Sequence, residues 1–452
     1  MHMRKTSQHG QWSSRFAFVL AATGSAVGLG NIWKFPYITG ENGGGAFVVV
    51  YLLCILAIGI PIMMAEVMLG RRGKQSPINT MRDLAKEAGS SPMWSWLGWL
   101  GVIAGFLILS YYSVIAGWAM AYVVRVASGV FEGATADGVS NIFVAFIADP
   151  EKLLAWHSLF MIVTMLVVAR GVKGLERTVK FLMPALLVIL VLLVGYAMDQ
   201  GAFQQGVSFL FTPDFSKINS DGVLTAMGHA FFTLSLGMGA IMVYGSYLPS
   251  NVSIGSTTVI IALADTAVAL LAGLVIFPIV FANGLEPGSG PGLIFQTLPI
   301  AFGHMAYGAF FGTLFFMLLV FAAWSSSISL IEPAVAWLVE NKNMSRMRAC
   351  IWSGLVTWML GIGTVLSFNV GADITLFGKT FFDTLDYLTA NVMLPLGGLG
   401  IALFAGWVMK KEASSAELNL TSKWQYLGWR FLIRFVSPAA VIIVFLNVIE
   451  LI

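Results

Sequence analysis

Two glycine-rich stretches, residues 24–31 and 232–239, interrupt otherwise apolar segments. Glycine disfavours continuous helix, so each stretch predicts a helix break. A break inside a membrane frees N–H groups that suit a carboxylate and carbonyl groups that suit Na⁺. Gly24 and Gly28 have the spacing of a helix-packing motif, which is the alternative interpretation. The second break and the adjacent Asn31 favour a binding site instead.

Polar side chains elsewhere in apolar runs add to this chemistry. Thr233, Ser325 and Ser326 offer neutral oxygens, which suit Na⁺ and accept no proton usefully near neutral pH. Asp265 is an acid within an apolar run, and such a residue is costly enough to indicate a function. Its alternative is a carboxylate satisfied by neighbouring hydroxyls. Asp265 is also the residue that could carry protons.

The elements that position these residues are membrane helices. The chain is 58% hydrophobic and only 10% charged, against about 25% charged in soluble proteins, so most of its surface must face lipid. About 20 apolar residues cross the hydrocarbon as a helix. Eleven such runs occur, at residues 16–38, 46–69, 97–124, 153–168, 178–197, 223–248, 257–281, 305–339, 349–368, 380–408 and 431–449. We therefore predict an all-α polytopic membrane protein with eleven transmembrane helices.

The two interrupted runs stand first in two successive blocks of five. Gly-interrupted segments in matching positions indicate a transporter built from inverted repeats. We predict one transmembrane domain over residues 1–452, with five-helix repeats at 16–197 and 223–408 and an eleventh helix at 428–450. Helices 1 and 6 are the broken ones in this 5+5 arrangement.

Basic residues cluster after the even-numbered runs, at residues 71–86, 170–180, 342–348 and 410–423. Cytoplasmic loops carry such an excess of Lys and Arg. This pattern predicts a multi-pass plasma (inner) membrane protein with a cytoplasmic N-terminus and an external C-terminus. The basic residues lie in short clusters between apolar runs, so the net charge of +3 does not indicate nucleic acid as a partner.

The sequence gives little support for an enzyme. The five histidines are dispersed, with no metal-ligand spacing, and no phosphate-binding loop motif occurs. We therefore expect neither an enzyme nor an ATP-driven pump within this chain.

The first break reads GSAVGLGNIWKFP over residues 24–36, followed by ENGGGAF over 41–47. Together with residues 61–66, 231–239 and 325–328, these strings closely resemble the signatures of the neurotransmitter:sodium symporters, in order along the chain. The resemblance is to amino-acid members with the leucine-transporter fold. It implies a sodium-coupled symporter that imports neutral hydrophobic L-amino acids by alternating access within the lipid bilayer.

The resemblance implies two sodium sites. The first would use the Ala26 carbonyl, Asn31, Thr233 and Asp265, with the substrate carboxylate completing the shell. The second would use the carbonyls of Gly24, Val27 and Ala322 with the hydroxyls of Ser325 and Ser326. The family often has threonine at position 325, and serine retains the hydroxyl.

Chloride dependence is expected to differ from that of the chloride-dependent members. Many members have asparagine where this chain has Asp265, and chloride-independent ones usually carry an acid four residues further on, where this chain has Ala269. We therefore expect Asp265 to supply the negative charge, which makes transport independent of chloride.

The substrate pocket implied by the resemblance consists of Ala26, Gly28, Gly30, Tyr112, Phe232, Ser235, Met238 and Ser326. Tyr112 would donate to the substrate carboxylate. Gly28 stands where monoamine carriers have an aspartate, so an amino acid is favoured over a monoamine. Met238 can adapt to varied apolar shapes, which suggests that the pocket accepts a broad range of hydrophobic side chains. The alternative is that Met238 is ordinary core filler.

The resemblance also implies gates. Lys34 and Asp386 match the outer cation–carboxylate pair, with lysine in place of arginine, above a lid of Phe232 and Tyr112. Trp12 matches the N-terminal segment that plugs the inner path, and Tyr247 and Glu340 match its partners. The family's arginine aligns with His9, so a direct ion pair with Glu340 is not predicted at this position. Arg4 or Lys5 could substitute, and the sequence does not decide which cation pairs with Glu340.

Gly174 and Pro184 could weaken the fifth helix and admit water to the second sodium site, or be a routine loop glycine and a tolerated proline. Two functions stay open beside the symporter. They are a proton-coupled amino-acid carrier and a transporter-like nutrient sensor of the same fold. The oligomeric state is also left open.

Overall fold

The computed structural model describes residues 7–287 and 293–448. Every regular element in this part of the chain is a helix, accompanied by two isolated bridge pairs. Within the described residues, nine helices are long and apolar enough to cross a membrane, and α1 with α2 forms a further span bent by 49°. The pair α11 and α12, separated by residues 234–239, completes the predicted eleven. The all-α membrane fold is confirmed.

The first block contains two helix pairs that are each one span, followed by three single helices. They are α1 (Arg15–Ala26) with α2 (Phe35–Glu41), α3 (Gly45–Cys54) with α4 (Ile60–Gly73), α6 (Ser95–Ala127), α8 (Pro150–Val168) and α9 (Gly171–Met198). Shorter helices connect them: α5 (Pro77–Ala88), α7 (Ala136–Ile147) and α10 (Phe203–Phe211).

The second block repeats the pattern from a broken first helix. Its spans are α11 (Ser220–Thr233) with α12 (Ala240–Ser246), α13 (Ile254–Ala282), α15 (Gly308–Lys342), α16 (Arg346–Ser367) and α17 (Phe381–Tyr387) with α18 (Leu394–Leu403). The connecting helices are α14 (Leu298–His304) and α19 (Lys411–Leu418), and the last span is α20 (Lys423–Phe431) with α21 (Ser437–Val448).

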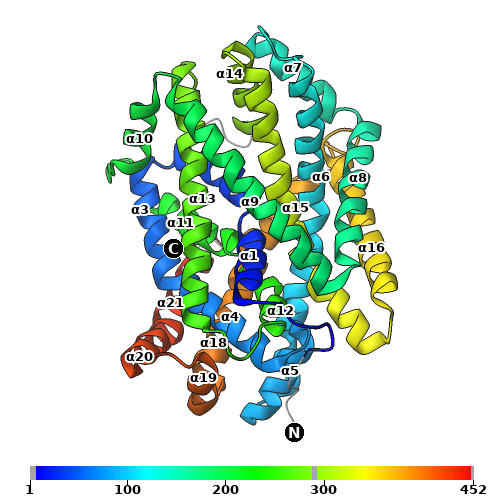
Figure 1. Ribbon diagram of the computed structural model, residues 1–452, viewed down its shortest axis with the longest axis vertical. Helices are drawn as coiled ribbons and strands as arrows, with labels where there is room; N and C mark the ends of the chain where they lie inside the picture. The colour runs from blue at the N-terminus through cyan, green and yellow to red at the C-terminus, as the bar shows by residue number, and fades with distance from the viewer. Residues whose placement is uncertain (1–6, 288–292, 449–452) are drawn as a thin grey trace.

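The broken helices occupy the centre of the bundle. Figure 1 shows α1 in the middle of the molecule, and it packs against α9, α13 and α15. α12 packs against α4 and α15, and α11 packs against α3. The helices α5 and α19 lie at the end of the bundle that carries the N-terminus, whereas α7 and α14 lie at the opposite end (Figure 1). We call these the inner and the outer end.

Helix caps fix where the central helices begin. The Ser14 hydroxyl accepts a hydrogen bond from the Ala17 N–H, and the Asn219 side chain accepts one from the Gly222 N–H. Each cap satisfies an N–H group that has no partner within its own helix. The first halves of both broken spans therefore start at a defined residue.

The fifth span differs from its prediction. α9 begins at Gly171, seven residues before the predicted start at Thr178, and runs through both Gly174 and Pro184 without a break. The cations at the start of α9 shortened the apolar run in the sequence, but cationic residues beyond the hydrocarbon do not interrupt a helix. No local unwinding forms at these two residues in this conformation.

Candidate functional site

The first break lies between α1 and a π-helical turn over Gly30–Lys34. Val27 has an extended backbone, with φ −69° and ψ 108°, so the α-helical path stops there. A Cβ on Gly28 would lie 2.5 Å from the Ser326 hydroxyl oxygen and 2.8 Å from that of Tyr112. Glycine at this position therefore lets two side chains from other helices approach the backbone.

The second break covers residues 234–239. Ser235, Gly237 and Gly239 all have positive φ, at 55°, 80° and 74°. A Cβ on Gly237 would lie 2.5 Å from the Leu394 carbonyl oxygen, so only glycine fits. The Ser235 hydroxyl donates to the Ser25 carbonyl at 2.8 Å, which joins the second break to the first.

A buried polar cluster lies beside the first break. The Asn31 amide donates to the Thr233 hydroxyl at 3.1 Å and to the Asp265 carboxylate at 2.8 Å. The Thr233 hydroxyl donates to the other Asp265 carboxylate oxygen at 2.9 Å. Asn31 and Asp265 are fully buried and Thr233 is 1% exposed. Three of the four residues predicted for the first ion site are thus in direct contact.

This cluster fits a sodium ion in its chemistry. It gathers hydroxyl, carboxylate and main-chain oxygens, since the Asn31 amide N–H also donates to the Asp265 carbonyl at 3.1 Å. The Asn31 amide oxygen accepts the Gly28 N–H at 3.0 Å, at the break itself. Hard cations prefer such oxygen ligands. Ala26, the fourth predicted ligand, ends α1 and lines the adjacent cavity.

The residues predicted for the second ion site also lie together, between α1 and α15. The Ser326 hydroxyl donates to the carbonyls of Gly24 and Val27, at 3.3 and 3.1 Å. The Ser325 hydroxyl donates to the Ala322 carbonyl at 3.0 Å. These neutral oxygens belong to two helices, so an ion bound among them would connect α1 to α15.

A small central cavity lies between the two breaks. All eight residues predicted for the substrate pocket line it: Ala26, Gly28, Gly30, Tyr112, Phe232, Ser235, Met238 and Ser326. Ser25, Leu29, Ile108, Thr233 and Leu330 complete the wall. Its volume is about 20 Å³, which is room for about one water molecule. A larger ligand therefore requires the walls to move apart.

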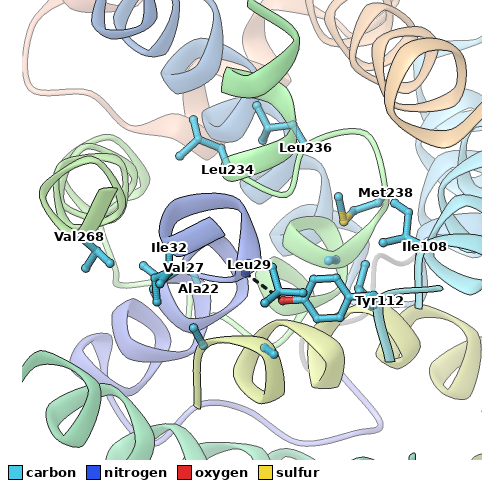
Figure 2. Close-up of a cluster of buried hydrophobic side chains, with 14 of the residues drawn as sticks. Ala22, Val27, Leu29, Ile32, Ile108, Tyr112, Leu234, Leu236, Met238 and Val268 are labelled. Atoms are coloured by element: carbon cyan, nitrogen blue, oxygen red, sulfur yellow. Dashed lines mark hydrogen bonds between the residues drawn. The ribbon is translucent and has the colours of Figure 1, made fainter. Parts of the chain in front are cut away.

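The cavity has one polar and one apolar end. The Leu29 N–H donates to the Tyr112 hydroxyl at 3.2 Å, as the dashed line in Figure 2 marks. Met238 and Ile108 lie close to each other beside the Tyr112 ring in the same view (Figure 2). Sequence reasoning missed Ile108 and Leu330, because an apolar residue that lines a cavity has the same pattern as one that packs in a core.

A larger cavity of about 310 Å³ lies on the other side of Phe232 and Tyr112. These two residues and Leu29 line both cavities, so they separate one from the other. Lys34 and Asp386 also line the larger cavity. The Lys34 ammonium lies 4.9 Å from the centre of the Phe232 ring, and the described residues contain no Lys34–Asp386 ion pair within 4.0 Å.

The inner end is closed by the segment before α1. Trp12 is 2% exposed, and its backbone N–H donates to the Tyr247 carbonyl at 3.0 Å while its indole N–H donates to the Tyr244 carbonyl at 2.9 Å. The Ser13 N–H donates to the Glu176 carboxylate at 3.1 Å. The N-terminal segment is thereby attached to both α12 and α9.

Glu340 closes the same end through contacts with three residues. His9 Nε2 lies 3.0 Å from the Glu340 carboxylate, so the direct contact that the sequence did not predict does form. The imidazole ring also stands beside Tyr247, with ring centroids 5.8 Å apart. The Ser76 N–H and the Asn79 amide also donate to Glu340, at 2.9 and 2.8 Å. Arg4 and Lys5 lie outside the described residues.

Two further buried acids were missed. The Tyr247 hydroxyl donates to Glu332 at 2.6 Å, and Glu332 pairs with Arg346 at 2.5 Å, so Tyr247 binds Glu332 and not Glu340 through its side chain. Glu66 accepts the Gly237 N–H of the second break at 2.6 Å. Both acids stand inside apolar runs, so the argument that singled out Asp265 could have found them.

Known proteins share this arrangement. The model of the sodium:neurotransmitter symporter family matches residues 9–132 and 149–452. An uncharacterized sodium-dependent transporter of Bacillus subtilis is 42% identical over 97% of each chain, and one of Haemophilus influenzae is 37% identical over 97% of this chain and 98% of its own. The chain belongs to the sodium:neurotransmitter symporter family.

One solved structure is similar to this chain over nearly its whole length. The crystal structure of MhsT in complex with L-phenylalanine has a TM-score of 0.90 and 46% sequence identity, covering 97% of this chain and 99% of its own. The family consists of sodium-coupled membrane transporters. This chain is accordingly a multi-pass, sodium-dependent transporter with the fold of MhsT.

Proposed function

We propose that this symporter imports neutral hydrophobic L-amino acids on a sodium gradient, by alternating access and without chloride. The observation that carries the proposal is the convergence of the two helix breaks on one cavity. Its polar end holds Tyr112 and the freed backbone at Leu29, and its apolar end holds Ile108 and Met238. A free amino acid with an apolar side chain has matching ends.

The polar end is suited to a carboxylate. Because the Leu29 N–H donates to the Tyr112 oxygen, the Tyr112 hydroxyl hydrogen is left to be donated. Gly28 brings no acid to this end, so nothing there competes with a substrate carboxylate. A monoamine, which lacks a carboxylate, would leave these donors unmatched, and unmatched donors cost binding energy.

Two sodium ions are proposed to travel with the amino acid. The first would be held by Ala26, Asn31, Thr233 and Asp265, and the second by Gly24, Val27, Ala322, Ser325 and Ser326. The first group shares Ala26 and Thr233 with the cavity wall, so ion and substrate occupancy are coupled there. The second joins α1 to α15, so its occupancy favours one position of α1.

Chloride independence is proposed from Asp265. Its carboxylate is fully buried and is bonded to two of the candidate ion ligands. A buried negative charge at that point offsets the charge of a bound cation without an added anion. Uptake that chloride stimulates would contradict this part of the proposal.

The inner end is proposed to be cytoplasmic, because the basic loops after the even-numbered spans lie there and such loops stay inside. α5 and α19 at that end carry cations of these loops, such as Arg82 and Lys411. The chain is then placed in the plasma (inner) membrane, with inverted repeats at residues 16–197 and 223–408.

The proposal is tested by uptake of labelled leucine and phenylalanine into liposomes that contain the purified protein. We expect accumulation with external sodium and none with choline. Asn31→Ala removes a candidate ion ligand and should abolish accumulation, whereas Asn341→Ala, at an exposed amide on α15, should leave it intact. Accumulation that is equal in sodium and choline would refute sodium coupling.

A proton-coupled carrier is the second candidate, because Asp265 places a buried carboxyl beside the candidate ion ligands. An imposed pH gradient in the absence of sodium separates the two functions. Uptake driven by that gradient alone favours proton coupling, and uptake that requires sodium favours the symporter.

A further inference from the structure

A long groove runs between α8 and α16 on the outside of the bundle. It encloses about 520 Å³ and is lined by apolar side chains of both helices, among them Met161, Met165, Met347 and Ile351. Ile351 is 58% exposed and Met347 is 55% exposed. Both helices are candidate membrane spans, so the groove faces the hydrocarbon of the bilayer. It shares no lining residue with the two central cavities.

The groove has the length of one lipid leaflet. At its deep end the Trp358 indole N–H donates to the Ser158 hydroxyl at 2.8 Å, which links α16 to α8 across the groove. At its other end lie Ala169 and Met347, eleven residues away along each helix. Eleven helical residues span about 16 Å, which is about half of the ~30 Å hydrocarbon thickness.

The end of the groove at Ala169 and Met347 is surrounded by basic residues. Arg170 directly follows Ala169, Arg348 directly follows Met347, and Lys173 lies in the first turn of α9. All three are exposed, and none takes part in an ion pair within the part of the chain that the structure describes. Arg346 connects the start of α16 to the end of α8, because its guanidinium donates to the Val168 carbonyl at 2.8 Å. The charge of Arg346 is neutralised by Glu332.

The floor of the groove is adaptable. A Cβ on Gly354 would lie 2.7 Å from Cγ of Met165, so α8 and α16 are in close contact at that point. Methionine side chains adapt to irregular apolar shapes. This floor suits one flexible hydrocarbon chain better than a rigid helix of a protein partner.

We propose that this groove binds an anionic membrane phospholipid. One acyl chain lies between α8 and α16, and the phosphate lies among Arg170, Lys173 and Arg348. Basic pockets between membrane helices recognise anionic headgroups in this way. The site is independent of the proposed transport function, since none of its residues contacts the central cavity.

The site is located with a phosphatidylglycerol that carries a photoactivatable group on its acyl chain. The full-length protein is labelled in nanodiscs of otherwise zwitterionic lipid, and the labelled peptides are mapped. We expect labels to concentrate at residues 158–169 and 347–358. The matched comparison is the exposed apolar face of α9 at Phe181, Leu187, Val188 and Val191. Equal labelling of α9 would overturn the proposal.

Headgroup recognition is measured by competition of phosphatidylglycerol with phosphatidylcholine for the same peptides. Each cation near an anionic headgroup contributes about 1 kcal/mol, so the double variant R170Q/R348Q should lower the preference for the anionic lipid roughly 25-fold. The control is K410Q/K411Q, which removes two exposed cations at the same end of the bundle. Equal effects of both double variants, or no preference in the original protein, would contradict the proposal.

Discussion

The two ends of the transport path are built differently. At the inner end Trp12, Ser13 and His9 each hold the N-terminal segment through a buried or partly buried hydrogen bond. At the outer end a cavity of about 310 Å³ remains, and Lys34 lies over an aromatic ring instead of against Asp386. The inner end is therefore closed by many contacts, whereas the outer end is separated from the central cavity by a few side chains.

This difference indicates the order of events in transport. In the proposed import cycle, a ligand enters through the outer cavity and must move Phe232 and Tyr112 to enlarge a central cavity of about 20 Å³. The inner contacts must then be broken before release. Each set of contacts biases the equilibrium between two conformations, so its removal should shift their populations.

The largest effect is expected from Trp12→Ala. Loss of a buried tryptophan costs about 3–5 kcal/mol, and here it also removes the hydrogen bond to the Tyr244 carbonyl. The inner end should open, which hydrogen exchange detects as faster exchange of the α12 amides. Trp424→Ala, at a side chain that is 81% exposed, is the control and should leave that exchange unchanged. Unchanged exchange in Trp12→Ala would show that Trp12 does not close the inner end.

A smaller effect is expected from Glu340→Gln. The carboxylate accepts from His9, Ser76 and Asn79, and hydrogen bonds to charged groups contribute about 1.5–3 kcal/mol. Exchange at Ser76 and at residues 7–12 should increase together. Glu412→Gln, on the exposed surface of α19, provides the comparison and should change neither. Faster exchange at Ser76 alone would mean that the contact between His9 and Glu340 does not stabilise the N-terminal segment.

Lys34→Arg should close the outer end more tightly and so make it more similar to the closed inner end. The planar guanidinium can form a bidentate pair with a carboxylate, which an ammonium cannot. A pair with Asp386 would narrow the outer cavity. The measurement is the rate at which a water-soluble thiol reagent labels Ile115→Cys, since Ile115 lines that cavity. We expect labelling to slow several-fold in the arginine variant, and an unchanged or faster rate would contradict a pairing role for position 34.

The smallest effect on stability is expected from Asp386→Asn. The described residues contain no ion pair between Asp386 and Lys34, and loose pairs contribute about 0–1 kcal/mol. Thermal unfolding should therefore shift far less than in Glu340→Gln. A shift of equal size would mean that the outer end is held as firmly as the inner one.

The sequence predicted the fold well because its main signals are local. Apolar length marks a span, and glycines at 28 and 237 mark breaks where other atoms approach the backbone. The start of α9 was wrong by seven residues, since Lys173 and Arg177 lower the hydropathy of a helix that extends beyond the apolar run. Hydropathy measures the lipid-facing part of a helix and not its full length.

The candidate site was predictable only where residue type reveals function. The candidate polar ligands, such as Asn31 and Asp265, are unusual in apolar runs, and the structure places these two in contact. Ile108 and Leu330 carry no such signal, although they line the same cavity. The His9–Glu340 contact depends on where the N-terminal segment docks, and a residue-by-residue alignment does not contain that information.

The central claim is that sodium and an amino acid bind to one connected site. The most direct test is the affinity of the purified protein for labelled phenylalanine, measured at increasing sodium with choline as the balancing cation. Linked binding requires the affinity to rise with sodium, and phenylalanine must raise the affinity for sodium by the same factor. We expect this reciprocal rise in the original protein and its loss in Asn31→Ala. Equal phenylalanine affinity in sodium and in choline would contradict it.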